Sequence, residues 1–200
     1  MRITIYFVSL CLMTTSAFCG EWIADKQNGC KVWNEQPAPG ESITWTGGCE
    51  GGKANGKGIL QLYKNNKKES KNEGEFKDGK MNGHGTKTFP DGTIYKGEFK
   101  EGNRNGHGTV NFPDGTIYEG EFKEGELNGH GTVNFPNGSK YEGEFKDGRR
   151  NGHGTATSPN GDRFTGAFSN DQRHGQGTFT YKDGTSYKGL WEHGEKIKIF

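Results

Sequence analysis

The sequence contains too little apolar side-chain material for an ordinary packed core. Only 28% of its 200 residues are hydrophobic, whereas globular domains hold roughly 40% apolar residues even without their glycine. Apolar residues at helical spacing are also lacking, because glycine interrupts every segment in which they could build up. These two shortages exclude a thick domain with one deep core and disfavour α-helices.

Neither sign of charge is in excess. Lys and Arg number 26, Asp and Glu number 25, and the formal net charge is +1. A chain this close to neutral has no long-range field that would recruit nucleic acid or an anionic membrane. We therefore expect no nucleic-acid partner, and a membrane surface stays an alternative that is not favoured.

Long hydrophobic runs are absent as well. The longest one, residues 3–13, is too short for a membrane-spanning helix, which needs roughly 20 residues. It follows one positive charge and precedes several small residues, which is the pattern of a secretory signal peptide over residues 1–19. Cleavage after Ala17 and cleavage after Cys19 both fit, and bulky Phe18 disfavours a lipoprotein anchor at Cys19. We expect an exported protein, periplasmic or secreted.

Cysteine is scarce, with four residues in the chain. Cys11 and Cys19 would leave with the signal peptide, so the mature chain keeps Cys30 and Cys49. An even pair in an exported protein indicates a disulfide, which would close a loop of about 20 residues and stabilise the fold by roughly 3 kcal/mol. The alternative is a metal site with two thiolates, but no further Cys or His lies close enough in the sequence to complete it.

Glycine is abundant, with 35 residues, and 12% of the residues are aromatic. The clearest motif, Asn-Gly-His-Gly, occurs at residues 82–85, 105–108, 128–131 and 151–154, each copy 23 residues after the last. A fixed period of this size indicates a stacked array of small structural units. Such arrays work through an extended surface, so the first functional question concerns a partner.

One unit, residues 95–117, shows how the repeat is expected to fold. Its first five residues alternate between charged side chains and aromatic rings or glycine, which is the pattern of a strand with two different faces. We expect a turn over residues 102–106, a second strand from residue 108, and a type I′ hairpin turn at Asp114-Gly115. Two strands per unit would advance the array by roughly 10 Å.

Weaker copies extend the array at both ends. A first copy has Cys49 where later units have phenylalanine, and Tyr187 opens a final half-unit. We count six units and a C-terminal half-unit over residues 45–200, preceded by an N-terminal segment, residues 20–44, that contains Cys30. The predicted fold is all-β, an elongated single-layer antiparallel meander of β-hairpins.

Glycine between two aromatic residues has a structural meaning. Gly97 lies between Tyr95 and Phe99 on one strand face and leaves room for a ring to cross the main chain. The spacing recurs along the array, so we expect rings to interleave, each pair adding about 0.5–1.5 kcal/mol beyond its buried area. Stability would then accumulate from neighbouring units.

The pattern Tyr-x-Gly-Glu-Phe-x-x-Gly-x-x-Asn-Gly-His-Gly-Thr resembles the MORN (membrane occupation and recognition nexus) repeat, and the resemblance covers residues 45–200. The segment 30–34, with Trp45 and Cys49, is similar to the opening of exported bacterial MORN proteins. The resemblance implies a single-layer sheet that serves as a scaffold, a dimerisation module or a docking surface. Phospholipid binding has been proposed for some members, and the enzymes among them carry a separate catalytic domain.

Two polar rows recur once per unit. One is His84, His107, His130 and His153, and the other is Glu75, Glu98, Glu121 and Glu144. Neighbouring histidines would lie about 10 Å apart, too far to share a metal ion. Turn capping or packing on a ring is favoured for them, with pH sensing and metal binding as alternatives. Catalytic carboxylate pairs flank a single cleft, so an even row of glutamates favours cross-strand ion pairs over catalysis.

The aromatic rows are the favoured partner surface, with a purely structural role as the alternative. They consist of Tyr95, Phe99, Tyr118, Phe122, Tyr141 and Phe145. The C-terminal strand alternates Lys and Ile, which either discourages aggregation or forms the seam of a homodimer. We therefore predict a non-enzymatic scaffold for protein–protein interaction, without catalytic or metal-binding residues and without a cofactor. The alternative is association with the cell envelope through lipid headgroups or glycans, and hydrolysis by the glutamate row is a weaker third hypothesis.

Overall fold

The computed structural model describes residues 20–200. The predicted signal peptide, with Cys11 and Cys19, lies outside the described residues. Within residues 20–200 the regular structure consists of strands, and no helix there is long and apolar enough to cross a membrane. The all-β prediction is confirmed.

The sheet contains 17 strands. They are β1 (Glu21–Ala24), β2 (Lys31–Asn34), β3 (Glu41–Trp45), β4 (Gly48–Glu50), β5 (Lys53–Lys64), β6 (Lys67–Lys77), β7 (Lys80–Thr88), β8 (Ile94–Lys100), β9 (Asn103–Asn111), β10 (Ile117–Lys123), β11 (Glu126–Asn134), β12 (Lys140–Lys146), β13 (Arg149–Thr157), β14 (Arg163–Ser169), β15 (Gln172–Thr180), β16 (Ser186–Glu192) and β17 (Glu195–Ile199).

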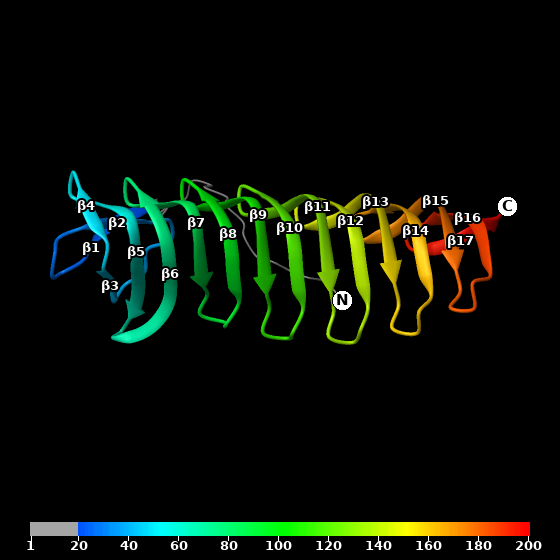
Figure 1. Cartoon of the computed structure of the whole chain (residues 1–200), viewed down its shortest axis with the longest axis horizontal. Helices are drawn as coiled ribbons and strands as arrows, with labels where there is room; N and C mark the ends of the chain where they lie inside the picture. The colour runs from blue at the N-terminus through cyan, green and yellow to red at the C-terminus, as the bar shows by residue number, and fades with distance from the viewer. Residues whose placement is uncertain (1–19) are drawn as a thin grey trace.

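From β5 onwards each strand pairs antiparallel with its neighbours in the chain. In the central strand β10, for example, Tyr118 lies opposite Val110 of β9 and Val133 of β11. Figure 1 shows these strands side by side in chain order along one elongated row. The predicted antiparallel meander is confirmed.

The two strands of a unit are joined by a tight turn at an unexpected place. In one unit the turn consists of Glu101 and Gly102, with φ values of 49° and 89°, and β9 begins directly after them. Positive φ at both residues is what a type I′ turn requires. The prediction of a turn over residues 102–106 is therefore wrong. The Asn-Gly pair that suggested it lies inside β9, where Gly106 uses its positive φ of 83° beside a β-bulge in the pairing with β8.

The connection between units is a longer loop. Only Gly115 has positive φ, 85°, while Pro113 and Asp114 do not. The Gly115 N–H donates to the Phe112 carbonyl at 2.9 Å, and the Thr116 N–H donates to Asp114 Oδ1 at 2.8 Å. Proline fixes φ near −65°, which suits the second position of a type I turn. The type I′ assignment at Asp114-Gly115 is therefore wrong.

The two faces of the sheet differ in chemistry. On one face, called the ring face below, Tyr118 packs edge-on against Phe122 of its own unit and Phe145 of the next, with centroids 5.2 and 5.3 Å apart. Similar edge contacts link the rings from Tyr95 to Trp191. The predicted interleaving is confirmed, and these nine rings are nearly half of the twenty buried hydrophobic residues that the structure describes.

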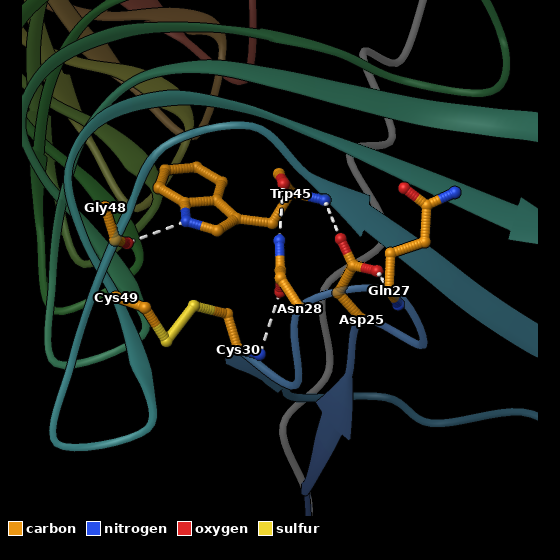
Figure 2. Close-up of a disulfide and its surroundings, with 7 residues drawn as sticks. All are labelled: Asp25, Gln27, Asn28, Cys30, Trp45, Gly48 and Cys49. Carbon is orange, nitrogen blue, oxygen red and sulfur yellow. Dashed lines mark hydrogen bonds between the residues drawn. A yellow bond between two sulfur atoms is a disulfide. The ribbon is translucent and has the colours of Figure 1, made fainter.

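A disulfide-linked segment covers the N-terminal end of the array. Strands β1 and β2 form an antiparallel hairpin, and a disulfide joins Cys30 to Cys49, as predicted. Figure 2 shows how the same segment holds Trp45: Asp25 Oδ2 accepts from its backbone N–H at 2.7 Å, and the Asn28 amide donates to its carbonyl at 2.9 Å. The hairpin is thereby fixed to the first unit.

Candidate functional site: the polar groove

The face opposite the rings is hollowed into one groove, called the polar groove below. It runs from Lys57 on β5 to Lys188 on β16 and Phe200, and its volume is about 1870 Å³. Residues of every unit line it, and the same residue types return at each step. The groove is therefore a feature of the whole array and does not belong to a single unit.

The floor of the groove is glycine main chain. Gly120 of β10 lies opposite Gly131 of β11, and both would direct a Cβ toward the ring face. A Cβ on Gly120 would lie 2.5 Å from Gly131 Cα, and a Cβ on Gly131 would lie 2.5 Å from Tyr118 Oη. Contacts this short are sterically forbidden. The ring packing on one face therefore requires glycine at these positions, and the same glycines form the floor of the groove on the other face.

Along one side of the groove, carboxylates and imidazoles alternate in a row on successive strands, and of this row Glu75 and the four histidines line the groove. We call this row the Glu–His ladder. It consists of Glu75, His84, Glu98, His107, Glu121, His130, Glu144 and His153, on β6 to β13 respectively. Cross-strand pairs such as His84 with Glu98, His107 with Glu121, and His130 with Glu144 continue it from unit to unit.

The main chain fixes the orientation of the ladder carboxylates. Glu98 Oε1 accepts the backbone N–H of His107 at 2.9 Å, and Glu121 and His130 repeat that bond at 2.9 Å. Each imidazole Nδ1 then lies 3.9–4.0 Å from the carboxylate of its own hairpin. The side chains of Glu98, Glu121 and Glu144 remain 42–43% exposed.

This geometry explains both glycines of the Asn-Gly-His-Gly motif. The first, Gly106, has φ of 83°, and the Glu98 carboxylate covers it so closely that a Cβ would lie 2.7 Å from Glu98 Cδ. The second, Gly108, lies beneath the ring of Tyr95. The backbone of His107 between them receives the carboxylate. Its side chain contributes to no such contact, so the fold does not account for histidine at this position.

The other wall carries threonine and a second charged row. Thr109 and Thr132 lie beside Lys96 and Glu119. Further along, Lys140 Nζ donates to Glu142 Oε2 at 2.8 Å, and this hydrogen bond lowers the pKa of the Glu142 carboxyl. Hydroxyl, ammonium and carboxylate groups thus face the ladder across the glycine floor.

The rings proposed as a partner surface are not accessible. Tyr95, Phe99, Tyr118, Phe122, Tyr141 and Phe145 are only 0–5% exposed. Burial also raises the pKa of the Tyr95 and Tyr141 phenols to about 12. The prediction that these six rings receive a partner is corrected accordingly, because neighbouring rings and cations cover the ring face.

The histidines occupy a different environment from the one expected. The side chains of His107, His130 and His153 are 78–85% exposed. Among residues 20–200, none of these imidazoles makes an aromatic contact, and no cluster of His, Cys, Asp or Glu is arranged to hold a metal ion. Ring packing is therefore wrong for their side chains, which point into the polar groove.

The cations that cover the rings were not predicted from the sequence. The Arg104 guanidinium lies 5.8 Å from the Tyr95 ring and 5.4 Å from the Phe122 ring, and burial lowers its pKa. Arg104 occupies the unit position of Met81 and Leu127, which are buried. A position shared by Met, Leu and Arg would have indicated a long side chain lying over a ring.

The repeat character of the N-terminal segment was not predicted either. Gly20-Glu21-Trp22 reproduces the Gly-Glu-Phe of later units, and Asn28-Gly29 follows at the spacing of their Asn-Gly pair. The structure forms these residues into the β1–β2 hairpin. This pattern is visible in the sequence, but Cys30 stands where later units have the histidine of the Asn-Gly-His-Gly motif, so the segment was not recognised as a repeat unit.

A family model described as MORN repeat matches residues 18–30, 73–94, 95–117, 118–140, 141–163 and 164–186. Four of these matches begin at the aromatic residues with which the predicted units begin: Tyr95, Tyr118, Tyr141 and Phe164. No curated protein matches the chain.

The chain is also similar to solved structures. One is the wild-type TCP10 domain of CPAP from Danio rerio, at 19% identity and a TM-score of 0.41, covering 72% of this chain and 67% of that one. Another is the TCP domain of SAS-4 (dCPAP) from Drosophila melanogaster, in complex with a proline-rich motif of Ana2, at 15% identity and a TM-score of 0.39, covering 84% of this chain and 94% of that one.

Proposed function

The chain belongs to the MORN repeat family, and from this premise we propose that it is a non-enzymatic scaffold that holds a protein partner in its polar groove. The observation that carries the proposal is the continuity of the groove, because one floor and two polar walls pass through every unit. A surface of this shape suits an extended segment of another protein. We place the contact in the groove because the rings of the opposite face are buried.

The repetition of the glutamates supports a binding role over catalysis. Glu98, Glu121 and Glu144 each accept the same backbone N–H and have the same exposure. Where two carboxyl groups act as general acid and general base, their environments differ so that their pKa values differ. Equivalent carboxylates in a row offer equivalent contacts to a partner instead.

An extracytoplasmic location is part of the proposal. It is supported by the disulfide between Cys30 and Cys49, because disulfides persist in oxidising compartments. The signal-peptide pattern of residues 1–19 points the same way. A fusion of the full chain to a reporter that is active only after export tests this location.

Site-specific photo-crosslinking in the native host tests the groove. A photoreactive side chain at Thr109 or Thr132 faces the groove, whereas one at Asp114 or Asn137 lies on the loops between units. We expect one defined protein adduct from the groove positions and none from the loop positions. Adducts from the loops alone would place the partner elsewhere and overturn the proposal.

The cell envelope is retained as a second candidate. The threonine, histidine and glutamate side chains of the groove can also hydrogen-bond the hydroxyl groups of a glycan or lipid headgroup. Co-sedimentation of the purified protein with cell-wall glycan or with vesicles, lost in the Thr109→Ala/Thr132→Ala variant, would favour this candidate over a protein partner.

Pairing with a second copy is proposed for the last strand. Ile197 and Ile199 of β17 are exposed, and within residues 20–200 β16 is the one strand paired with β17. Sedimentation of the protein over a range of concentrations tests for a homodimer, which Ile197→Lys should dissociate. A monomer at all concentrations would contradict the pairing.

A further inference from the structure

On the ring face, one unit differs from the others in three neighbouring side chains. Asn72 stands where later units have a tyrosine or phenylalanine ring, and Lys87 stands where the next unit has Val110. These two residues lie opposite each other in the pairing of β6 with β7. Beside them, Arg104 stands where the next unit has Leu127. Three polar groups thus come together where other units have mostly apolar side chains.

Lys87 and Arg104 share the ring of Phe89. Lys87 Nζ lies 5.0 Å from the centroid of this ring, and Arg104 Cζ lies 5.8 Å from it. Burial lowers the pKa of the Lys87 ammonium, and the Arg104 guanidinium lowers it further. Both side chains are half-buried, so a small ligand can still reach their charged ends. Two like charges held this close disfavour each other unless an anion binds between them.

No carboxylate of residues 20–200 forms an ion pair with either cation. Two carboxylates act on them from a greater distance, Glu35 on Lys87 and Glu126 on Arg104. Both carboxylates belong to exposed residues, so water screens their charge. Because charges withdrawn from water are normally paired in proteins, the arrangement is one that an anion completes.

A later unit has the same arginine together with a counter-charge. Arg150 stands two units after Arg104, and its Nε lies 3.3 Å from Asp171 Oδ1. The earlier unit has Gly125 at the position of Asp171, and Arg104 Nη2 donates to the carbonyl of that glycine. The later unit also has a valine in place of the lysine. The fold therefore does not require two cations without a carboxylate at this place.

The third polar group selects among anions. Asn72 Oδ1 is buried and accepts no hydrogen bond from a described residue. An unsatisfied buried acceptor destabilises a fold, and such departures from local rules are expected at functional sites. Because Asn72 lies across from Lys87 on the same face, an oxyanion bound to Lys87 satisfies this acceptor only if it carries an O–H group. Hydrogen phosphate carries such a group, whereas sulfate does not.

We propose that Lys87, Arg104 and Asn72 form a binding site for a phosphate group that retains one proton. The two cations hold its charged oxygens, and Asn72 accepts its O–H. The site lies on the ring face, across the sheet from the polar groove, and therefore goes beyond the proposed function. Each chain has one such site, since no other unit combines a lysine, an arginine and an amide at these positions. Free phosphate and the phosphate headgroup of a lipid share this chemistry.

The direct test is a calorimetric titration of the full mature chain with inorganic phosphate and, separately, with sulfate. In a buffer of near-neutral pH without other oxyanions, we expect a single phosphate to bind at least about tenfold more tightly than sulfate, because sulfate leaves the Asn72 acceptor unsatisfied. Equal affinities would show a general charge effect and overturn the proposal. Absence of phosphate binding would overturn it as well.

Vesicles distinguish the two sources of the phosphate group. Co-sedimentation with vesicles that contain phosphatidic acid, but not with vesicles of phosphatidylcholine alone, would assign the ligand to a lipid headgroup. Binding of inorganic phosphate without binding to either kind of vesicle would assign it to free phosphate.

The repeat supplies matched variants. Lys87→Val and Arg104→Leu each introduce the residue that another unit has at that position, so both proteins should fold. Each should bind phosphate at least about tenfold more weakly, because one charge-assisted contact is lost. The control is Arg173→Leu, which removes a guanidinium 5.6 Å from the Phe164 ring at the same unit position. It should bind like the parent. Equal losses in the three variants would overturn the proposal.

Two further variants test how the anion is held. Gly125→Asp gives Arg104 the carboxylate that Asp171 gives Arg150, and Asp171 itself has a φ of 70° at this turn position. This internal carboxylate should compete with phosphate and weaken its binding at least about tenfold. Asn72→Leu should remove the preference for phosphate over sulfate and leave sulfate binding unchanged. Phosphate binding like that of the parent in Gly125→Asp, or an unchanged preference in Asn72→Leu, would overturn the proposal.

Discussion

At Gly131 the main chain passes directly beneath the Tyr118 ring, which also contacts Phe122 and Phe145. A missing side chain therefore decides whether two units can pack together. The ring face and the floor of the polar groove depend on the same glycines. Packing and binding surface are thus coupled at single residues.

Gly131→Ala should show this coupling. Its Cβ would lie 2.5 Å from Tyr118 Oη and displace a ring that two neighbours enclose. We expect a loss of about 1–3 kcal/mol in the free energy of unfolding, the usual range for overpacking. Urea denaturation measures it, with His130→Ala at the adjacent exposed position as the control. Similar values for the two variants would contradict the ring-over-glycine packing.

At Asn72 a substitution should raise the stability of the protein. It occupies the ring position of its unit, and its buried Oδ1 has no hydrogen-bond partner among the described residues. Asn72→Leu removes the unpaired acceptor and adds apolar surface opposite Leu60, so stability should rise by about 1–3 kcal/mol. Calorimetry checks this, and Asn111→Leu on an exposed position should bring no gain. A less stable Asn72→Leu protein would show that the amide has an unrecognised role.

At the scale of single residues, the sequence predicted that rings and glycines share one face of the sheet, but it did not predict which side chains lie over the rings. Alternation along residues 95–99 placed rings and glycines on one face. It could not show that the Arg104 guanidinium lies over the Tyr95 and Phe122 rings, because an arginine in a strand is equally suited to solvent. The rings were therefore expected to be accessible.

At the scale of elements, the two kinds of turn have separate tasks. A two-residue turn, such as Glu124-Gly125, closes each hairpin, and a longer loop such as the one containing Pro113 connects it to the next unit. Both were expected in some form, but Asn-Gly and Asp-Gly pairs are ambiguous. A glycine with positive φ serves a type I′ turn, the last position of a longer loop, or a bulge inside a strand.

The N-terminal hairpin depends on its disulfide. Cys30→Ser/Cys49→Ser removes the bond that ties β2 to β4, so we expect a cost of roughly 3 kcal/mol from the opened loop. The loss should be local, because each unit contacts only its neighbours. Hydrogen exchange should show faster exchange in β1–β5 and an unchanged rate in β12–β15. Uniform acceleration along the chain would contradict local coupling.

At the scale of the whole molecule, the buried tyrosines make the array sensitive to alkali. Burial raises the pKa of Tyr95 and Tyr141 from the ordinary phenol value of 10.0 to about 12, and it raises the pKa of Tyr118 in the same direction. Between these values the unfolded chain loses protons that the folded chain retains. Stability is therefore fully present below pH 10 and is lost as the pH rises toward 12.

Urea unfolding across this pH range, with phenolate absorbance as a second signal, measures the effect. Phe164 occupies the same ring position without a hydroxyl, so the Tyr95→Phe/Tyr118→Phe/Tyr141→Phe variant should fold and lose most of the alkaline dependence. Tyr63→Phe, outside the ring row, should retain it. A triple variant with the alkaline response of the parent would assign that response to other groups.

The period of the array allows a deletion that tests the architecture as a whole. Removing residues 120–142 joins Glu119 to Gly143 and recreates the strand sequence Ile-Tyr-Glu-Gly-Glu-Phe with one unit fewer. Because each unit packs only on its neighbours, the shorter chain should fold with a lower melting temperature. Small-angle scattering should find it about 10 Å shorter.

The control deletion removes residues 121–142 and leaves one extra glycine between Tyr118 and Phe145. Side chains alternate along a strand, so this single residue moves the downstream ring to the groove face. Because the new Tyr–Phe contact and its glycine floor cannot form together, the control should lose cooperative unfolding at the junction although it retains more of the sequence. Equal stability of the two deletion variants would contradict the prediction that the sheet depends on the 23-residue period of the repeat.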